Sequence, residues 1–490
     1  MPTIEHHALA GTVHAHAMQR WVWPDAAARL AENVAAADVG KVGVQQDSGE
    51  FWLLRDSSGP EWAPLATARA VVNPRAFGAK GDGTDDSAPF QAALDRIAAI
   101  GGGVLDIPPG TFSLRSKIDL PSVPFAMRGA GMGLSVIDWD ASTTLFSIFG
   151  GRGSFEYVEL SDFTIQGEWG ALQSDQPPVL PVEIYGADRV TMQRVELRNC
   201  HNFGFVLRNC EEVLITECRV RENGRDAISV ATCSRVTVAD NQIDHCDDDA
   251  IAVHMTHDNA GSIRQGVVIA NNRISDSQGI SAIGLRRASI CGNQIERTRQ
   301  IGISVGAAAG DETVPHAIAI TGNVITDVFD RSAIDGVNNG AAYIRVQSTP
   351  QAGTGVAVPG LPDGSGAFEL VDENLHNYAA GDPYPPAHWL NISGNVCART
   401  LPSGVAYSSY GYGQMFTRNG YVDPVVTEAM LSETSIGLEL AEVRDSVISN
   451  NTFRGQSAGI RFVSGSDDHD NVLIAHNIIT RFGLGGIVFG

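Results

Sequence analysis

The sequence has no long hydrophobic run, because no stretch approaches the roughly 20 apolar residues that span a membrane. Basic residues are also scarce: 34 Lys and Arg stand against 56 Asp and Glu, which gives a formal net charge of -22. This balance argues against nucleic acid and against an anionic membrane surface as partners. The N-terminal residues lack a basic segment followed by an apolar core, so we expect no signal peptide.

Cysteine is sparse as well. The 490 residues include seven cysteines, and no two of them form a CxxC pair. We therefore expect them to pack as small side chains in a protein made in a reducing cytoplasm, without a disulfide framework or a metal site. We predict no metal site and no cofactor, with Ca²⁺ as an alternative at one acidic cluster described below.

A short pattern recurs between residues 188 and 330 and returns beyond residue 390. An alternating apolar segment rich in Val, Ile and Thr ends at a turn residue, and further apolar positions follow. The turn residues are Arg194, Cys218, Asn241, Asn272, Asn293, Asn323, Asn395, Asn451 and Asn477. The shortest steps between them are 21, 23 and 24 residues, which predicts a solenoid whose rung is three short strands.

The segments between these turns identify the kind of solenoid. They alternate with period 2 and carry no helical period, which favours a parallel β-helix over a leucine-rich horseshoe or a βαβ fold. Asparagine tolerates the left-handed backbone region, and its amide can bond along a stack of identical turns. We therefore expect the recurring Asn residues to occupy left-handed turns and to form a ladder.

Residues 1–66 differ in composition from the rest and hold four of the seven tryptophans, Trp21, Trp23, Trp52 and Trp62. The pattern predicts a short helix at 24–30 and two strands, 41–45 and 50–54, joined by a turn. The string VGKVGVQQDSGEFWLLRD resembles the small N-terminal modules of phage tail fibres and tail spikes. The resemblance implies a location in the virion tail and attachment to other tail or baseplate proteins.

Residues 71–140 contain a second resemblance. Phe77-Gly78-Ala79, the acidic turn 81–86 and Ile107-Pro108-Pro109-Gly110 are similar to the head of the pectate-lyase-like right-handed β-helix superfamily, which includes many tail spikes. A helix capped by Asp86 or Ser87 follows the acidic turn. We expect its apolar stripe, Phe90, Leu94, Ile97 and Ala98, to close the open end of the solenoid.

Together these observations predict an all-β protein: a right-handed parallel β-helix with an N-terminal capping helix and a small N-terminal β module. The expected domains are an attachment module at 1–66, the β-helix head and capping helix at 67–140, and the parallel β-helix at 141–490. Two Gly/Pro-rich insertions, 337–388 and 405–435, interrupt the repeat. The aromatic side chains of Tyr407, Tyr410 and Tyr412 are candidates to hold sugar rings, and packing onto the scaffold is the alternative.

Carboxylates gather in the middle of the repeat. Aligned strands place Asp226 and Asp249 on neighbouring rungs, about 4.8 Å apart, with Asp247 and Asp248 at the adjoining turn. Carboxylates at this distance raise one another's pKa, so one can hold a proton near neutral pH. Glycoside hydrolysis needs such a pair, one as acid and the other as base or nucleophile. A diagonal pair, Asp226 and Asp248, would leave room for a water and favour inversion.

The segment Asn223-Gly224-Arg225-Asp226, followed by Asp248-Asp249-Ala250-Ile251, resembles the polygalacturonase-type motif. The resemblance implies that Asp248 is the general acid and that Asp226 and Asp249 hold the attacking water. Gln278 stands where that family has a histidine, so His254 and His257 are candidate substitutes. These three residues and Arg345, a faint match to the family's basic motif, are candidate substrate-binding residues. The alternative is an acidic turn cluster that is solvated or holds Ca²⁺.

The resemblances together imply a phage tail-spike depolymerase, an endo-glycoside hydrolase that binds and hydrolyses a bacterial surface polysaccharide. A polysaccharide lyase on the same fold and a non-catalytic receptor-binding fibre are the alternatives. Similar spikes are homotrimers, so we expect a homotrimer.

Overall fold

The chain divides into two compact units, Met1–Val71 and Val72–Gly490. The computed structural model describes residues 19–46, 51–58, 61–64, 71–139, 147–167, 180–200, 203–246, 248–254, 266–307, 315–328, 341–350, 387–400, 407–408, 425–426, 435–463 and 469–489. No helix within these residues is long and apolar enough to cross a membrane.

The N-terminal unit is a four-stranded sheet, in the order β1-β2-β3-β4, with its own apolar core. Its elements are β1 (Gln19–Trp23), α1 (Ala26–Leu30), η1 (Ala36–Asp38), β2 (Val42–Gln45), β3 (Phe51–Asp56) and β4 (Glu61–Pro64). The predicted pair of strands is present as the antiparallel β2 and β3. Trp21, Trp23, Leu54 and Trp62 form the core. The indole ring of Trp62 packs edge to face against Trp21 and Trp23, whose own rings are stacked.

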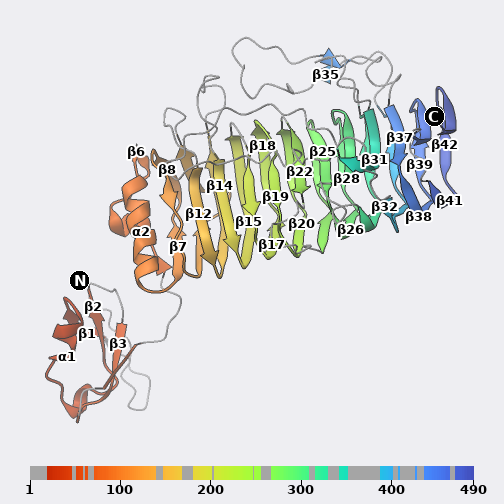
Figure 1. The fold of residues 1–490 in the computed structure, drawn as a ribbon. Helices are drawn as coiled ribbons and strands as arrows, with labels where there is room; N and C mark the ends of the chain where they lie inside the picture. Colours follow the sequence, from red (N-terminus) through yellow and green to blue (C-terminus); the bar gives the residue numbers. More distant parts are fainter. Residues whose placement is uncertain are drawn as a thin grey trace, which may run out of the picture. The chain divides into compact units, whose positions relative to one another are not determined.

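The second unit is a right-handed parallel β-helix, as predicted (Figure 1). One rung consists of β17 (Glu212–Thr216), β18 (Arg219–Asn223) and β19 (Ile228–Ala231). The strands of the next rung, β20 (Val236–Ala239), β21 (Gln242–Cys246) and β22 (Asp249–His254), pair with them in parallel, one to one. Side chains at equivalent positions therefore form columns along the helix.

The rungs build two long sheets. The 12-stranded sheet contains β9 (Ile118–Asp119), β12 (Ser147–Phe155), β14 (Leu180–Ala187), β16 (Phe205–Arg208), β19, β22, β25 (Gln278–Ile283), β28 (Ile301–Ala307), β31 (Ala341–Pro350), β37 (Ser435–Ala441), β40 (Ala458–Phe462) and β43 (Gly485–Phe489).

The 25-stranded sheet holds the other two strands of each rung. Besides β17, β18, β20 and β21, it contains β5 (Val71–Val72), β6 (Asp82–Asp85), β7 (Gly103–Ile107), β8 (Gly110–Leu114), β10 (Phe125–Gly129), β11 (Ser135–Trp139), β13 (Val158–Gln166), β15 (Arg189–Cys200), β23 (Val267–Ala270), β24 (Arg273–Ser275), β26 (Arg286–Cys291), β27 (Gln294–Glu296), β29 (His316–Thr321), β30 (Val324–Thr326), β32 (Ala387–His388), β33 (Asn391–Ser393), β34 (Val396–Ala398), β38 (Val443–Ser449), β39 (Thr452–Arg454), β41 (Asp470–Ala475) and β42 (Ile478–Thr480).

The predicted insertions contain structured segments. Residues 337–388 include β31, which pairs with β28 on one side and β37 on the other. The prediction therefore wrongly assigned a strand of the β-helix to the first part of this insertion. Apolar residues at alternate positions of 341–346 mark β31 as a rung strand. Within 405–435, β35 (Tyr407–Ser408) pairs with β36 (Val425–Val426). The rest of both insertions, apart from the first residue of β37 and all of β32, lies outside the described residues.

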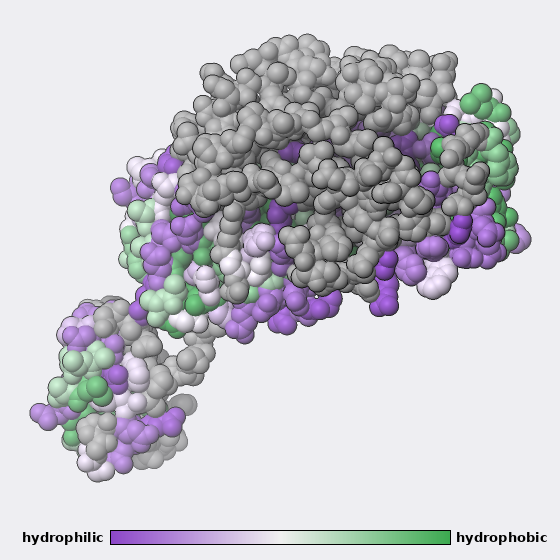
Figure 2. All heavy atoms as spheres, in the orientation of Figure 1, coloured by the Kyte–Doolittle hydropathy of each residue, from purple (hydrophilic) through white to green (hydrophobic). Residues whose placement is uncertain are grey.

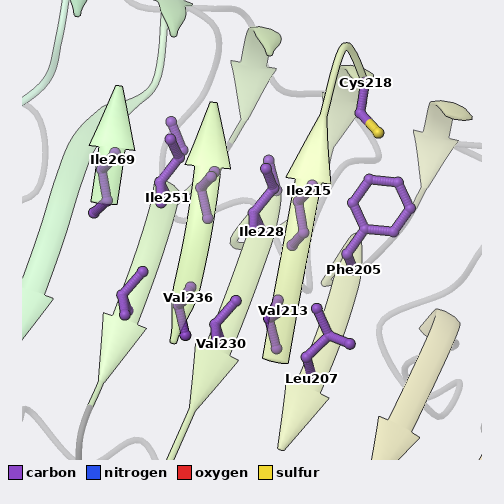
Figure 3. Packing of buried hydrophobic residues seen from close by; sticks show 14 of the residues in the cluster. Phe205, Leu207, Val213, Ile215, Cys218, Ile228, Val230, Val236, Ile251 and Ile269 are labelled. Carbon is purple, nitrogen blue, oxygen red and sulfur yellow. The ribbon is translucent and has the colours of Figure 1, made fainter. Parts of the chain in front are cut away.

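Stacked apolar side chains fill the β-helix (Figure 3). Phe205, Ile228 and Ile251 come from successive strands of the 12-stranded sheet and lie level with Ile215 of the 25-stranded sheet. Val213 and Val236 of the 25-stranded sheet lie level with Leu207 and Val230. Each such side chain stabilises the fold by about 1.5–3 kcal/mol when fully buried. Six of the seven cysteines are buried in the same way, and none is in a disulfide.

Helix α2 (Ser87–Ala99) lies at the β6–β8 end of the β-helix (Figure 1). Phe90, Leu94 and Ile97 are buried as predicted, but Ala93 completes the stripe and Ala98 is exposed. The Asp86 side chain does not cap the helix. It accepts hydrogen bonds from the backbone N–H groups of residues 80 and 81, at 2.7 and 3.0 Å, and so holds the acidic turn.

The asparagine ladder is present, and its left-handed positions lie one residue earlier than predicted. Each ladder Asn donates from Nδ2 to Oδ1 of the next, at 2.9–3.0 Å, from Asn241 to Asn477. The residues with positive φ directly precede them, as Asp240 does at 59°. Arg194, at 51°, belongs to this preceding column, so Val195 and not Arg194 aligns with the ladder.

Hydrophilic side chains line the lower edge of the β-helix in the view of Figure 2, and hydrophobic ones gather over its last rungs. The exposed apolar residues of these rungs are Leu473, Ile478, Phe482, Leu484, Ile487 and Phe489.

Candidate active site

Three carboxylates meet where two successive rungs enter the 12-stranded sheet. Asp226 precedes β19, Asp249 is the first residue of β22, and Asp248 is the residue before it. The backbone N–H of Ala227 donates to the Asp249 carbonyl at 3.0 Å, so Asp226 and Asp249 lie on neighbouring rungs as predicted. One oxygen from each of the three carboxylates lies within 4.8 Å of the others.

Buried polar side chains fix the turns that carry these carboxylates. The fully buried Asn223 donates from Nδ2 to the carbonyls of Arg225 and Asp226, at 2.7 and 3.0 Å. In the following rung, Cys246 takes the place of Asn223. There the fully buried guanidinium of Arg299 donates to the Cys246 carbonyl. The chain therefore has little freedom on either side of the carboxylates.

Electrostatics distinguish the three carboxylates. Burial raises the pKa of Asp249 well above its ordinary value, and the charges of Asp248 and Asp226 raise it further. A hydrogen bond with Ser281 and the charge of Arg225 oppose this pKa shift without cancelling it. A carboxyl group with a raised pKa beside other carboxyl groups is what acid–base chemistry requires.

Asp248 has two polar neighbours. Gln278, the register partner of Asp249 in β25, donates from Nε2 to Oδ1 of Asp248 at 2.5 Å. On the other side, Nε of Arg225 lies 3.9 Å from Oδ2. An amide and a cation thus flank Asp248. The amide belongs to Gln278, which stands where the polygalacturonase-type motif has a histidine.

The register fixes an alignment that the hydrophobic pattern alone leaves ambiguous, because Ile280 and Ile283 both fit an apolar position. Ile280 pairs with Ile251, so the segment Ser277-Gln278-Gly279 enters the sheet beside Asp248 and Asp249.

The other predicted substrate-binding residues are spread more widely. His254 lies at the far end of β22, where Nε2 is 3.0 Å from Oγ of Ser281. Arg345, on β31, is three rungs from Asp249, or about 14 Å along the axis. It is buried and forms an ion pair with Glu439 at 2.6 Å. The structure therefore does not bring Arg345 to the carboxylates.

Some predicted residues are not described. Asp247, His257, Tyr410 and Tyr412 lie outside the described residues, and Tyr407 is described only as part of β35. Sequence reasoning missed Arg225, Ser281 and Arg299. Of these, Arg225 had a usable signal, because it directly precedes Asp226 in the same turn.

A second acidic cluster lies on the neighbouring sheet. Asp244, His245 and Asp276 also bring one ligand atom each within 4.8 Å of one another. However, Arg297 donates to Asp276 at 2.7 Å, and Asp244 pairs with Nδ1 of His245 at 2.9 Å. The hydrogen bond that His245 donates to Asp244 raises the pKa of His245. These charges neutralise one another within the protein.

The first cluster offers three ligand oxygens to a cation. With one oxygen each, Asp226, Asp248 and Asp249 would supply at most half of the six to eight oxygens that Ca²⁺ takes. A bound sugar or water would have to supply the rest. The same three carboxylates can serve proton transfer without additional groups, which fits the raised pKa of Asp249.

Comparisons with known proteins agree with this fold. Residues 181–349 match the family model described as a right-handed β-helix region. An alginate lyase of Azotobacter vinelandii, alginate lyase 7, is 31% identical over 172 residues, which is 31% of this chain and 20% of the relative. Mannuronan C5-epimerase AlgE5 of the same organism is 34% identical over 151 residues, 27% of this chain and 15% of the relative.

Among solved structures, the A-module of the Azotobacter vinelandii mannuronan C-5 epimerase AlgE6 has a TM-score of 0.50 at 17% identity. The alignment covers 85% of this chain and 99% of that module. At this identity the likeness shows a shared fold. The chain matches a fifth or less of the length of the two curated relatives.

Proposed function

We propose that this protein is a polysaccharide-cleaving enzyme that hydrolyses glycosidic bonds at Asp226, Asp248 and Asp249. The observation that carries the proposal is the meeting of three carboxylates from two neighbouring rungs, one of which has a strongly raised pKa. Glycoside hydrolysis needs one protonated and one ionised carboxyl group beside the scissile bond. The relatives named for alginate and mannuronan support a polysaccharide as the substrate.

In this proposal Asp249 donates the proton to the leaving oxygen. The polygalacturonase-type motif assigns that role to Asp248, but burial and two neighbouring charges favour the proton on Asp249. Asp226 and Asp248 are then the carboxylates that act as base or nucleophile. One oxygen of each lies within 4.8 Å of an oxygen of the proposed acid, Asp249, and this separation is closer to the ~5–5.5 Å of retaining enzymes than to the ~6.5–9.5 Å of inverting ones. The distance therefore does not favour inversion.

The second candidate is proton abstraction from the sugar, which would make the protein a lyase or an epimerase. The identity to alginate lyase 7 and to AlgE5 favours it. An ionised carboxylate would act as the base, and a neighbouring cation would neutralise the sugar carboxylate. Arg225 is such a cation within the described residues.

The experiment is to incubate the protein with alginate and with a panel of bacterial capsular polysaccharides. New reducing ends, without the ultraviolet absorbance of unsaturated uronates, are the expected result. Asp248→Asn and Asp249→Asn should each lower the rate about 100-fold or more. Asp240→Asn is the matched control, because it removes the same charge from an exposed turn.

The other outcomes separate the alternatives. Growing ultraviolet absorbance would identify a lyase, and altered sugar stereochemistry without new chain ends, followed by NMR, would identify an epimerase. Binding without any chemical change in the polymer would contradict the enzyme and leave a receptor-binding fibre.

We place the enzyme on a phage tail as a homotrimeric spike that acts on a bacterial surface polysaccharide. The support is the resemblance of residues 39–56 to tail-fibre modules, together with the separate core of the N-terminal unit. Light scattering that gives three chains per particle, and co-purification with tail or baseplate proteins, would be the expected results. A monomer that binds no virion protein would contradict this placement.

A further inference from the structure

Arg225 lies at the edge of the three carboxylates in a fixed position. Asn223 holds its carbonyl, and its guanidinium lies 4.3 Å above the ring of Phe203. Phe203 is buried, so the ring cannot easily move away. The planar guanidinium therefore has a defined orientation beside Asp248.

Among the described residues, no hydrogen-bond acceptor pairs closely with this guanidinium. Its Nε makes no hydrogen bond within the described part of the chain, and the nearest Asp248 oxygen is 3.9 Å away. Some other arginines of the β-helix pair more closely, although Arg198 also lies 3.9 Å from its partner Glu196. Arg194 meets Asp162 at 2.6 Å, and Arg297 meets Asp276 at 2.7 Å. Because 24% of the Arg225 side chain is exposed, the donors that it offers to a ligand are those of its exposed part and not the buried Nε.

The charge balance explains why a cation at this place matters. The chain carries a formal charge of -22, and three carboxylates line the site itself, so an anionic sugar would be repelled. A proton on one carboxyl and the charge of Arg225 would offset two of these three negative charges. A neutral sugar would not need the positive charge of Arg225.

We propose that Arg225 binds the carboxylate of a uronic acid residue, so that the substrate is an acidic polysaccharide. The inference rests on the proposed function, since it seats the sugar against the same carboxylates. The planar fork of arginine matches a carboxylate with two parallel hydrogen bonds, whereas lysine presents a single point charge. Stacking on Phe203 holds the fork ready for this contact.

The test measures binding separately from cleavage. Affinity for alginate, polygalacturonate and hyaluronan is measured by calorimetry and compared with carboxyl-reduced forms of each polymer and with dextran sulfate. The variants are Arg225→Gln and Arg225→Lys. Arg235→Gln is the control, because it removes the same charge from an exposed arginine paired with Glu211 and Glu212. Far-ultraviolet circular dichroism checks that each variant is folded.

At least one uronate polymer should bind, and its carboxyl-reduced form and dextran sulfate should not. Arg225→Gln should weaken this binding about 10- to 100-fold, as expected for hydrogen bonds to a charged group, and Arg225→Lys should restore only part of it. Binding by Arg235→Gln should equal that of the wild type.

Three results would overturn the inference: no binding of any uronate polymer, equal binding by Arg225→Gln, or equal binding of dextran sulfate. Cleavage of a neutral polymer without dependence on Arg225 would overturn it and leave the hydrolase intact. Binding that depends on Arg225, without new reducing ends, would instead contradict the hydrolase and keep the acidic-sugar site.

Discussion

At the scale of the residue, the carboxyl group that we propose as the catalytic acid, Asp249, also affects stability. Its pKa in the folded protein lies well above the ordinary value of 3.8. Above that ordinary value the unfolded chain releases a proton that the folded protein retains, so this group makes folding less favourable as pH rises. Below it both states are protonated, and the group contributes nothing.

Asp249→Asn should therefore stabilise the protein at pH 7 while it removes activity. We expect a gain of about 0.5–2 kcal/mol, typical of relieving a strained active site. At pH 3.5 the gain should vanish, provided that the fold persists there. Urea unfolding at the two pH values measures it, with Asp240→Asn as the control. A gain of equal size at both pH values would contradict the assignment of the proton to Asp249.

At the scale of the element, the asparagine ladder gives the turns of the β-helix their stability. Asn323 is fully buried and donates from Nδ2 to the carbonyl of Ile290 and to Oδ1 of Asn395, both at 2.9 Å. Its own Oδ1 accepts from the backbone and the side chain of Asn293, at 3.0 and 2.9 Å. Removing it leaves buried donors and acceptors without partners.

Asn323→Ala should cost about 2–4 kcal/mol in the free energy of unfolding, because water cannot replace the lost partners. Asn477→Ala is the comparison. Asn477 makes nearly the same hydrogen bonds, but it is half-buried at the end of the ladder. There the loss should be about 1 kcal/mol or less. Equal losses at the two sites, measured by urea unfolding, would show that burial does not control the ladder.

The repeat made much of this predictable from the sequence. Period-2 segments and recurring Asn residues predicted the rungs, and the stacking of Asp226 and Asp249 followed from their alignment. The roles of Arg225 and Arg299 did not follow, since a hydrophobic pattern locates the core and not the direction of a turn side chain. Arg194 was placed in the ladder because adjacent turn positions look alike where no Asn marks them.

At the scale of the whole molecule, the two units have separate apolar cores. The core of the N-terminal unit is the tryptophan cluster of Trp21, Trp23 and Trp62, whereas that of the β-helix runs continuously from Val72 to Phe462. Contacts between neighbouring rungs stabilise a solenoid, and a terminal rung has a neighbour on one side only. The stability of the solenoid therefore depends on how its own ends are covered. At the β6–β8 end, α2 closes the core with Phe90, Leu94 and Ile97.

Two changes should therefore affect the stability of the β-helix to very different degrees. Deletion of residues 1–71 should leave its thermal transition within a few degrees, because none of the residues in its core is lost.

Leu94→Ala should lower the free energy of unfolding by about 2–5 kcal/mol, since it opens a cavity where the core meets α2. Calorimetry measures both transitions, and Leu30→Ala, at an exposed leucine of α1, controls for the substitution itself. A large loss on deletion would mean that the β-helix draws stability from the N-terminal unit. A negligible loss for Leu94→Ala would mean that the first rungs fray without affecting the rest, as a chain of weakly coupled rungs allows.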